Sequence, residues 1–254
     1  MITNFANNPL SFFDKVNLEF QRVASRLLFV ITGPLMNYMV FGKFKLRFED
    51  IKEVRSTYRK MLSEGKGPIL LCSNHLTYVD SVIQSVFLAS IIGHLFKFSQ
   101  LAWHLPEKSN FAHNFKWRTL CYLGKCIPVI RSGSREETKR VMQKMLYVLD
   151  RGDVISIFPE GTRSRSGLID DENFSYGVGQ ILKHYDHSRI LCIYMRDKND
   201  GGFAKFPKKD ADYYFKLEMF NPTSELKGNR KAKDLSTQVV KKLKEMEDQF
   251  FLAH

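Results

Sequence analysis

Two short polar segments, about eighty residues apart, carry the residue types that acid–base chemistry and anion binding require. The first contains His75 and Asp80, and the second is Phe-Pro-Glu-Gly-Thr-Arg-Ser at 158–164. A carboxylate that holds one imidazole nitrogen fixes the tautomer and raises the basicity of the other nitrogen. This pair therefore predicts a general base that needs no serine nucleophile and takes its proton from a substrate hydroxyl.

The spacing of this pair limits where its two residues lie. On a regular helix, residues five apart point about 140° away from each other. We therefore expect His75 in a loop before a helix and Asp80 in the first turn, where a carboxylate also suits the helix dipole. Alone, this spacing is more often an ordinary polar loop, so the prediction depends on the second segment.

The second segment has the composition of an anion site. Its proline and glycine predict a tight turn that exposes backbone N–H groups beside hydroxyls and a guanidinium. Arg163 suits bidentate phosphate binding, and Glu160 would orient either that arginine or a substrate hydroxyl. Arg131 follows another apolar run, and we expect it to face one anion together with Arg163 and Arg165. The alternative is a solvated basic turn.

Both segments follow apolar runs that predict buried strands, and the carboxyl ends of such strands are where open α/β sheets bind ligands. Strands and helices alternate along the chain, so we expect an α/β fold with a layered central sheet flanked by helices. The expected strands are 44–48, 68–73, 95–101, 126–130, 153–158, 189–195 and one near 215–219. The expected helices are 51–63, 78–91, one ending near 122, 134–150 with a capping box, 174–185, and 234 to the end.

Length and cysteine usage indicate a domain with its own core in a reducing compartment. A chain of 254 residues buries a sizeable core without staples. The four cysteines form no Cys-x-x-Cys pair, which favours free thiols in core positions. No signal peptide is recognisable, and we expect the active face to be cytoplasmic.

The formal charge of +12 calls for an acidic partner: nucleic acid, an anionic membrane surface or a phosphorylated substrate. Phenylalanines beside basic residues near the amino terminus favour the membrane surface. The basic residues at 205–209 and 227–233 accompany no recognised nucleic-acid module, so we expect no nucleic acid partner and assign them to a solvated or lipid-facing surface.

The segment 25–42 is strongly apolar, but Arg26, Thr32 and Asn37 interrupt it. Gly33-Pro34 is expected to break it into two short helices that lie in the membrane interface and do not span it. A helical hairpin that covers the core is the alternative. We therefore divide the chain into a membrane-interface element at 1–43 and an α/β domain at 44–254.

In combination, the Asn-His-x-x-x-x-Asp block, the segment from Gly124 to Arg131 and the Phe-Pro-Glu-Gly-Thr-Arg-Ser block resemble those of glycerolipid acyltransferases, especially bacterial lysophosphatidic acid acyltransferases. The resemblance covers about 68–195. It implies that His75 deprotonates a glycerol hydroxyl, which attacks the thioester of acyl-CoA or acyl-carrier protein, while Asp80 supports the imidazolium. The amino-terminal element also resembles that of the family's bacterial members, and we expect a peripheral or monotopic enzyme at the cytoplasmic face of the membrane.

Carried over in the same way, Glu160, Gly161, Thr162 and Arg163 would hold the glycerol phosphate of the acceptor, with Arg131 near its phosphate. The product would be phosphatidic acid, and no cofactor beyond the acyl donor is implied. The family's fourth block usually carries prolines, which 189–195 lacks. Another lyso-lipid acceptor, including an amino-acid lipid, and a non-catalytic lipid-binding protein therefore stay open.

Other chemistries have weaker support. His184 and His187 lie near a helix end without a carboxylate or thiol cluster, so we interpret them as surface histidines and predict no metal. The sequence has no Gly-x-Ser-x-Gly elbow and no Gly-x-x-x-x-Gly-Lys loop, which argues against a serine hydrolase and a P-loop nucleotidase.

Overall fold

A computed structural model describes residues 10–65, 67–131, 133–185, 189–199 and 203–254. Within these residues, one six-stranded sheet has the order β1-β6-β5-β2-β4-β3. The strands are Arg47–Phe48 (β1), Ile69–Ser73 (β2), Trp103–His104 (β3), Ile155–Ile157 (β4), Arg189–Asp197 (β5) and Asp212–Phe220 (β6). β5, β2, β4 and β3 are mutually parallel, whereas β6 is antiparallel to β5. The predicted α/β class with a layered central sheet is confirmed.

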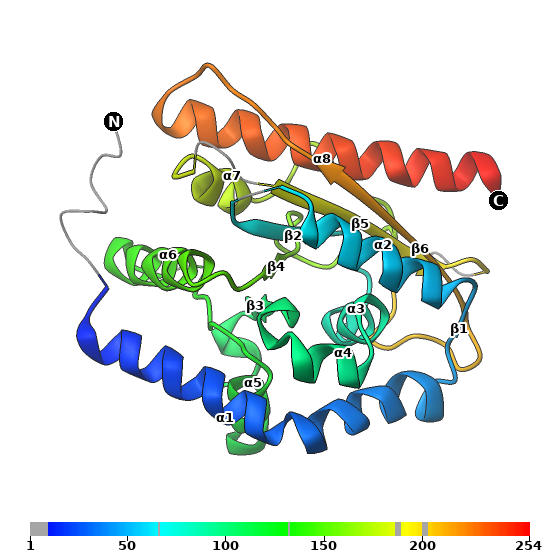
Figure 1. Cartoon of the computed structure of the whole chain (residues 1–254). Helices are drawn as coiled ribbons and strands as arrows, with labels where there is room; N and C mark the ends of the chain where they lie inside the picture. The colour runs from blue at the N-terminus through cyan, green and yellow to red at the C-terminus, as the bar shows by residue number, and fades with distance from the viewer. Residues whose placement is uncertain (1–9, 66, 132, 186–188, 200–202) are drawn as a thin grey trace.

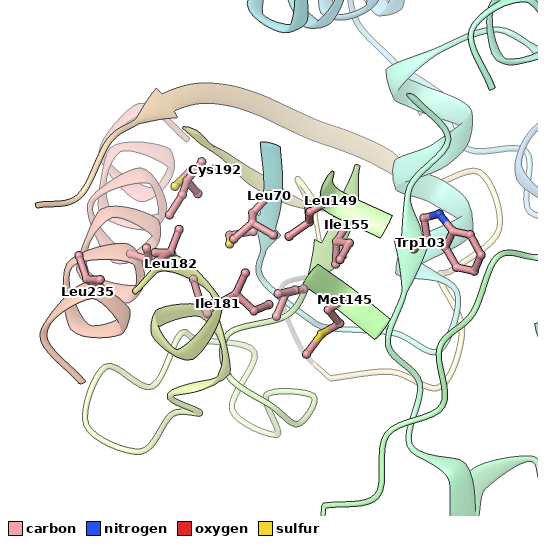
Figure 2. Close-up of a cluster of buried hydrophobic side chains, with 14 of the residues drawn as sticks. Leu70, Trp103, Met145, Leu149, Ile155, Ile181, Leu182, Cys192 and Leu235 are labelled. Atoms are coloured by element: carbon pink, nitrogen blue, oxygen red, sulfur yellow. The ribbon is translucent and has the colours of Figure 1, made fainter. Parts of the chain in front are cut away.

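Helices cover both faces of this sheet (Figure 1). They are α1 (Phe12–Asn37), α2 (Ile51–Ser63), α3 (Asp80–Leu88), α4 (Ile91–Phe96), α5 (Phe115–Leu123), α6 (Arg135–Asp150), α7 (Gly177–Leu182) and α8 (Gly228–Ala253). Side chains alternate along β2, so that Leu70 packs with α6, α7 and α8, whereas Leu71 packs with α2 and α3. Figure 2 shows Met145, Ile181 and Leu235 gathered around the first of these clusters.

The strongest local patterns of the sequence form as predicted. Helix α2 has the expected bounds, and α6 begins with the capping box. The Glu137 N–H donates to Ser134 Oγ at 3.2 Å, and the Ser134 N–H donates to Glu137 Oε2 at 2.8 Å. All five residues of β2 are buried, as expected for a central parallel strand. Periodicity and capping chemistry therefore suffice for these elements.

The strand predicted at 95–101 is wrong, because this stretch is helical. Helix α4 and a short 3₁₀ turn occupy it, and β3 lies beyond it. Leu95, Phe98 and Leu101 all pack beside Phe29 of α1. Their spacing of three is that of a helical face and not the alternation of a strand.

The strand predicted at 126–130 does not form, and the one predicted at 44–48 is shorter than expected. The run around Pro128 makes only isolated bridges, one of them between Cys126 and His104. Proline has no N–H to donate, so it interrupts a ladder of hydrogen bonds. The strand predicted at 44–48 shrinks to β1, because Lys45 adopts a left-handed conformation with φ of 50°.

The amino-terminal element is one continuous helix and not two. Helix α1 runs through Gly33 and Pro34 into a π-helical segment, Tyr38–Lys43, and Figure 1 shows its ribbon bending without a loop. A Cβ on Gly33 would lie 3.0 Å from the Phe29 ring and 3.3 Å from Ile91, so glycine permits close packing there. The proline costs one helical hydrogen bond and favours a bend. The predicted hinge between two helices is therefore wrong.

Helix α1 has one face tied to the rest of the protein and another in solvent. Gln21 donates to the carbonyls of Tyr122 at 2.9 Å and Cys126 at 3.0 Å, and Arg22 pairs with Asp153. The large exposed apolar side chains of the helix include Phe12, Phe13, Val16, Phe20, Val23, Leu27, Val30, Ile31 and Leu35. Among the described residues, the helical stretch Phe12–Lys43 alone is long and apolar enough to cross a membrane.

Candidate active site

His75 and Asp80 meet where the sequence places them. His75 lies in the loop after β2, and Asp80 is the first residue of α3. The distance from His75 Nδ1 to Asp80 Oδ2 is 2.9 Å. The Asp80 side chain is 2% exposed, whereas that of His75 is 20% exposed. One imidazole nitrogen is therefore held by a buried carboxylate while the ring remains accessible.

Asp80 is fixed by further hydrogen bonds from its own loop. The N–H groups of Leu76 and Thr77 donate to Oδ2 at 2.6 and 2.8 Å, and the Thr77 hydroxyl donates to Oδ1. These bonds require that the chain turn just before α3. The carboxylate thereby shapes the loop that presents His75.

Asn74 attaches the same loop to the neighbouring strand. Its amide nitrogen donates to the Met195 carbonyl at 2.9 Å, and its amide oxygen accepts from the Met195 N–H at 2.9 Å. The buried Asn74 side chain thus replaces a backbone partner for β5. It fixes the direction in which the chain leaves β2.

The second segment contacts the first directly, because β2 and β4 are adjacent parallel strands. The His75 N–H donates to Glu160 Oε1 at 2.9 Å, and the His75 carbonyl accepts from the Ser164 N–H at 2.9 Å. The Phe158 ring stacks on the imidazole, with centroids 4.0 Å apart and planes 13° apart. The predicted meeting of the two segments at one sheet edge is therefore confirmed.

Gly161 gives the second segment its tight turn. Its φ is 69°, in the left-handed region that favours glycine, and a Cβ there would lie 3.2 Å from Ser175. Burial raises the pKa of the neighbouring Glu160 to about 8, although the His75 N–H opposes that rise. Glu160 therefore holds its proton more tightly than an ordinary carboxyl group.

Arg163 is held between aromatic rings. Its guanidinium lies 3.5 Å from the Tyr78 ring centroid and 5.1 Å from that of Phe203. Its buried Nη1 has no hydrogen-bond partner within the part of the chain that the structure describes. A positive, oriented group with an unused donor is suited to an anionic ligand.

The remaining predicted residues are less constrained. Thr162 is exposed at the turn, and Arg165 is exposed as well. Arg131 contacts Glu107 through its Nε at 3.4 Å and through its backbone N–H at 3.1 Å. The predicted convergence of the three arginines on one anion stays a prediction.

Sequence reasoning did not assign roles to Asn74, Tyr78, Phe158 or Phe203. Asn74 and Phe158 stand inside the two motifs, so their position was a usable signal. Tyr78 also follows His75 closely, but its partner Arg163 is remote in the chain. Phe203 lies far from both motifs and has no local signature.

No group of three or more His, Cys, Asp or Glu that could hold a metal ion occurs among the described residues. His184 is half-buried. His187, the other histidine of that sequence prediction, lies outside the described residues. The His75–Asp80 pair is suited to proton transfer, and Arg163 is suited to an anionic ligand.

A family model and solved structures are similar to this chain. The acyltransferase family model matches residues 45–195, more than half of the chain. No curated protein matches it. Among solved structures, the 1-acyl-sn-glycerophosphate (LPA) acyltransferase PlsC from Thermotoga maritima is similar at 14% identity and a TM-score of 0.42, over 91% of this chain and 96% of that one.

The chain therefore belongs to the acyltransferase family and is an enzyme that transfers acyl groups. Both motifs, with His75, Asp80 and Arg163, lie inside the matched region. The flanking α1 and α8 lie outside it.

Proposed function

We propose that this acyltransferase moves a fatty acyl chain from acyl-CoA or acyl-carrier protein to the hydroxyl of a lysophospholipid. The acceptor we propose is 1-acylglycerol-3-phosphate, with phosphatidic acid as product. The observation that carries the proposal is the 2.9 Å contact between His75 Nδ1 and Asp80 Oδ2. It leaves Nε2 of the imidazole as the basic nitrogen.

In the proposed reaction, His75 Nε2 takes the proton of the acceptor hydroxyl as its oxygen attacks the thioester carbonyl carbon. Asp80 accepts the Nδ1–H hydrogen bond and stabilises the imidazolium that forms. The tetrahedral intermediate collapses, the carbon–sulfur bond breaks, and the proton leaves with the thiol. An ester and a free thiol result, and no further cofactor enters the balance.

The acceptor phosphate is assigned to Arg163, whose buried Nη1 has no protein partner among the described residues. Gly161 and Thr162 would contribute the turn, and Glu160 would hold the glycerol part through its second oxygen. Glu160 already accepts the His75 N–H at 2.9 Å, so this carboxyl group would link acceptor and base. Arg131 would approach the phosphate by leaving Glu107.

We propose that the enzyme works at the cytoplasmic face of a membrane as a peripheral or monotopic protein. The exposed apolar side chains of α1 support this, including Phe12, Phe13 and Phe20, which are 74%, 83% and 66% exposed. The hydrogen bond of Gln21 to Tyr122 and the ion pair of Arg22 with Asp153 attach the helix to the domain. In this division, 1–43 contacts lipid and 44–254 performs catalysis; residues 1–9 lie outside the described part.

The test is thiol release by the full-length protein from palmitoyl-CoA, with and without 1-acylglycerol-3-phosphate. Parallel arms replace the donor with palmitoyl-acyl-carrier protein and the acceptor with other lyso-lipids, including an amino-acid lyso-lipid. We expect release that depends on the phosphate-bearing acceptor, with phosphatidic acid as the lipid product. Thiol release that occurs with another lyso-lipid but not with 1-acylglycerol-3-phosphate would overturn the assigned acceptor. No release with any pair of donor and acceptor would overturn the proposed reaction.

A further inference from the structure

The end of helix α5 brings two cysteines together by a defined turn. The Cys126 N–H donates to the Cys121 carbonyl at 3.1 Å, and the Lys125 N–H donates to the Tyr122 carbonyl at 3.3 Å. This pair of bonds is a Schellman motif, in which side chains at the third-last helical position and the second position past the cap meet. Here cysteine occupies both positions.

The turn is held by Lys125, which stands where glycine usually closes this motif. Its φ is 54°, in the left-handed region. Its fully buried ammonium group donates to the carbonyls of Phe98 at 3.2 Å and Leu101 at 2.6 Å and lies 3.4 Å from Asp153. Burial of these groups fixes the backbone between the two cysteines and keeps their side chains in register.

The turn makes the two cysteines neighbours, and both are accessible. The Cys126 thiol donates to the Gly124 carbonyl at 3.8 Å. The interaction between the two cysteines lowers the pKa of Cys121 and raises that of Cys126. Both side chains are half-buried and line a cavity of about 390 Å³ between α1 and α5. Lower pKa and access favour Cys121 as the attacking thiolate.

We propose that Cys121 and Cys126 form a redox-active dithiol that a low-molecular-weight disulfide converts to an intramolecular disulfide. The Cys121 thiolate attacks one sulfur of the oxidant, which forms a mixed disulfide and releases one thiol. Cys126 then loses its proton, attacks the Cys121 sulfur and releases the second thiol. Two electrons and two protons pass from the dithiol to the oxidant.

The other two cysteines give an internal control. Cys72 and Cys192 are register partners on β2 and β5, so they too are neighbours. Both are fully buried, and Figure 2 shows Cys192 inside the hydrophobic cluster. Burial raises the pKa of both thiols. Proximity is thus shared by the two pairs, whereas access is not.

The experiment incubates the full-length protein in glutathione buffers of increasing oxidised fraction, then denatures and alkylates it and maps the peptides by mass. We expect a Cys121–Cys126 disulfide at an oxidised fraction of glutathione at which Cys72 and Cys192 remain free thiols and are alkylated. In the Cys126→Ser variant, the second step is blocked, so a glutathione adduct should accumulate on Cys121. In Cys121→Ser, Cys126 should react more slowly.

Three results would overturn the proposal. One is full alkylation of Cys121 and Cys126 across the whole series. Another is a glutathione adduct on the wild-type protein that persists and is not converted to the Cys121–Cys126 disulfide. The third is equal oxidation of the buried pair, since it would mean that access plays no part. None of these readouts depends on acyltransferase activity.

Discussion

Two aspartates, Asp80 and Asp153, are equally buried at 2% exposure but have different partners. Asp153 contacts two cations, Arg22 and Lys125, and accepts from the Trp103 indole at 2.9 Å. Burial lowers the pKa of Lys125 to about 8, although Asp153 opposes that fall. The ion pairs of this cluster hold α1 and the turn after α5 in place.

The partners that the structure gives Asp80 are instead an imidazole and groups of its own loop. With one ring nitrogen held by the carboxylate, the other nitrogen of the imidazole is left to accept a proton. Burial of a carboxylate therefore does not by itself mark a catalytic residue. What separates the two regions is the chemical type of the partner: an imidazole at Asp80, and a guanidinium with an ammonium group at Asp153.

The largest expected effect is on turnover. His75→Ala should lower the rate of acyl transfer by a factor on the order of 10²–10⁴, because the base is removed. Its unfolding free energy should change less, since Asp80 keeps the hydrogen bonds from its own loop. Thiol-release kinetics and urea unfolding measure the two quantities. A near-normal rate would end the base assignment.

Asp153→Asn should show the reverse pattern. Removing the carboxylate leaves Lys125 and Arg22 without their shared partner, and breaking a buried pair costs about 3–5 kcal/mol. Activity per folded molecule should be retained, because this cluster takes no part in proton transfer. Urea unfolding together with specific activity checks this. Unchanged stability would remove the distinction between the two aspartates.

Acid should lower the stability of the folded protein through His94 of α4. Burial lowers its pKa from 6.5 to about 4, and its ring packs edge-on against Phe29 of α1. The unfolded chain therefore binds the extra proton first, and stability falls as pH decreases from 6.5 towards 4. The contribution of His94 to that loss is at most about 3 kcal/mol. Unfolding across this window should show it, and His94→Gln should reduce the slope; His104, whose pKa burial also lowers to about 4, contributes in the same window.

Arg163→Ala should weaken acceptor binding by about 1.5–3 kcal/mol, the scale of a lost hydrogen bond to a charged group. The KM of a phosphate-bearing acceptor should rise more than that of a phosphate-free one. Arg163→Lys is the matched control, because it keeps the charge but loses the planar fork. Equal effects on both acceptors would argue against phosphate binding.

The smallest effect should come from Tyr78, which we expect to position Arg163. Tyr78→Ala removes the ring stacked on the guanidinium and should cost about 1 kcal/mol in acceptor binding. Tyr78→Phe keeps the ring and should restore a near-normal KM. If both variants lose affinity equally, the hydroxyl and not the stacking is what matters; if neither loses affinity, Tyr78 does not position Arg163.

Local patterns in the sequence suffice for part of this molecule. The capping box of α6, the buried run of β2 and the His75–Asp80 spacing each depend on neighbours in the chain. The apolar run at 95–101 is compatible with a strand or a helix, and its contacts with Phe29 select the helix. Gly33-Pro34 locally favours a break in the helix, but packing around Gly33 keeps α1 continuous.

Contacts between remote residues could not be predicted in this way. The bond from the His75 N–H to Glu160 and the ring stack of Phe158 need the register of β2 on β4. Asp153 gave no signal, since its partners Arg22 and Lys125 stand elsewhere in the chain. Such groups can be named only when the sheet and α1 are in place.

The register of β2 on β4 also frees the site from the length of the chain between its two halves. Leu70 lies beside Ile155 and Cys72 beside Ile157, so strand pairing alone sets how far His75 stands from the turn at Gly161. Changes of length in exposed turns outside these paired strands would leave that distance unchanged. Such turns can therefore diversify while the two motifs remain aligned.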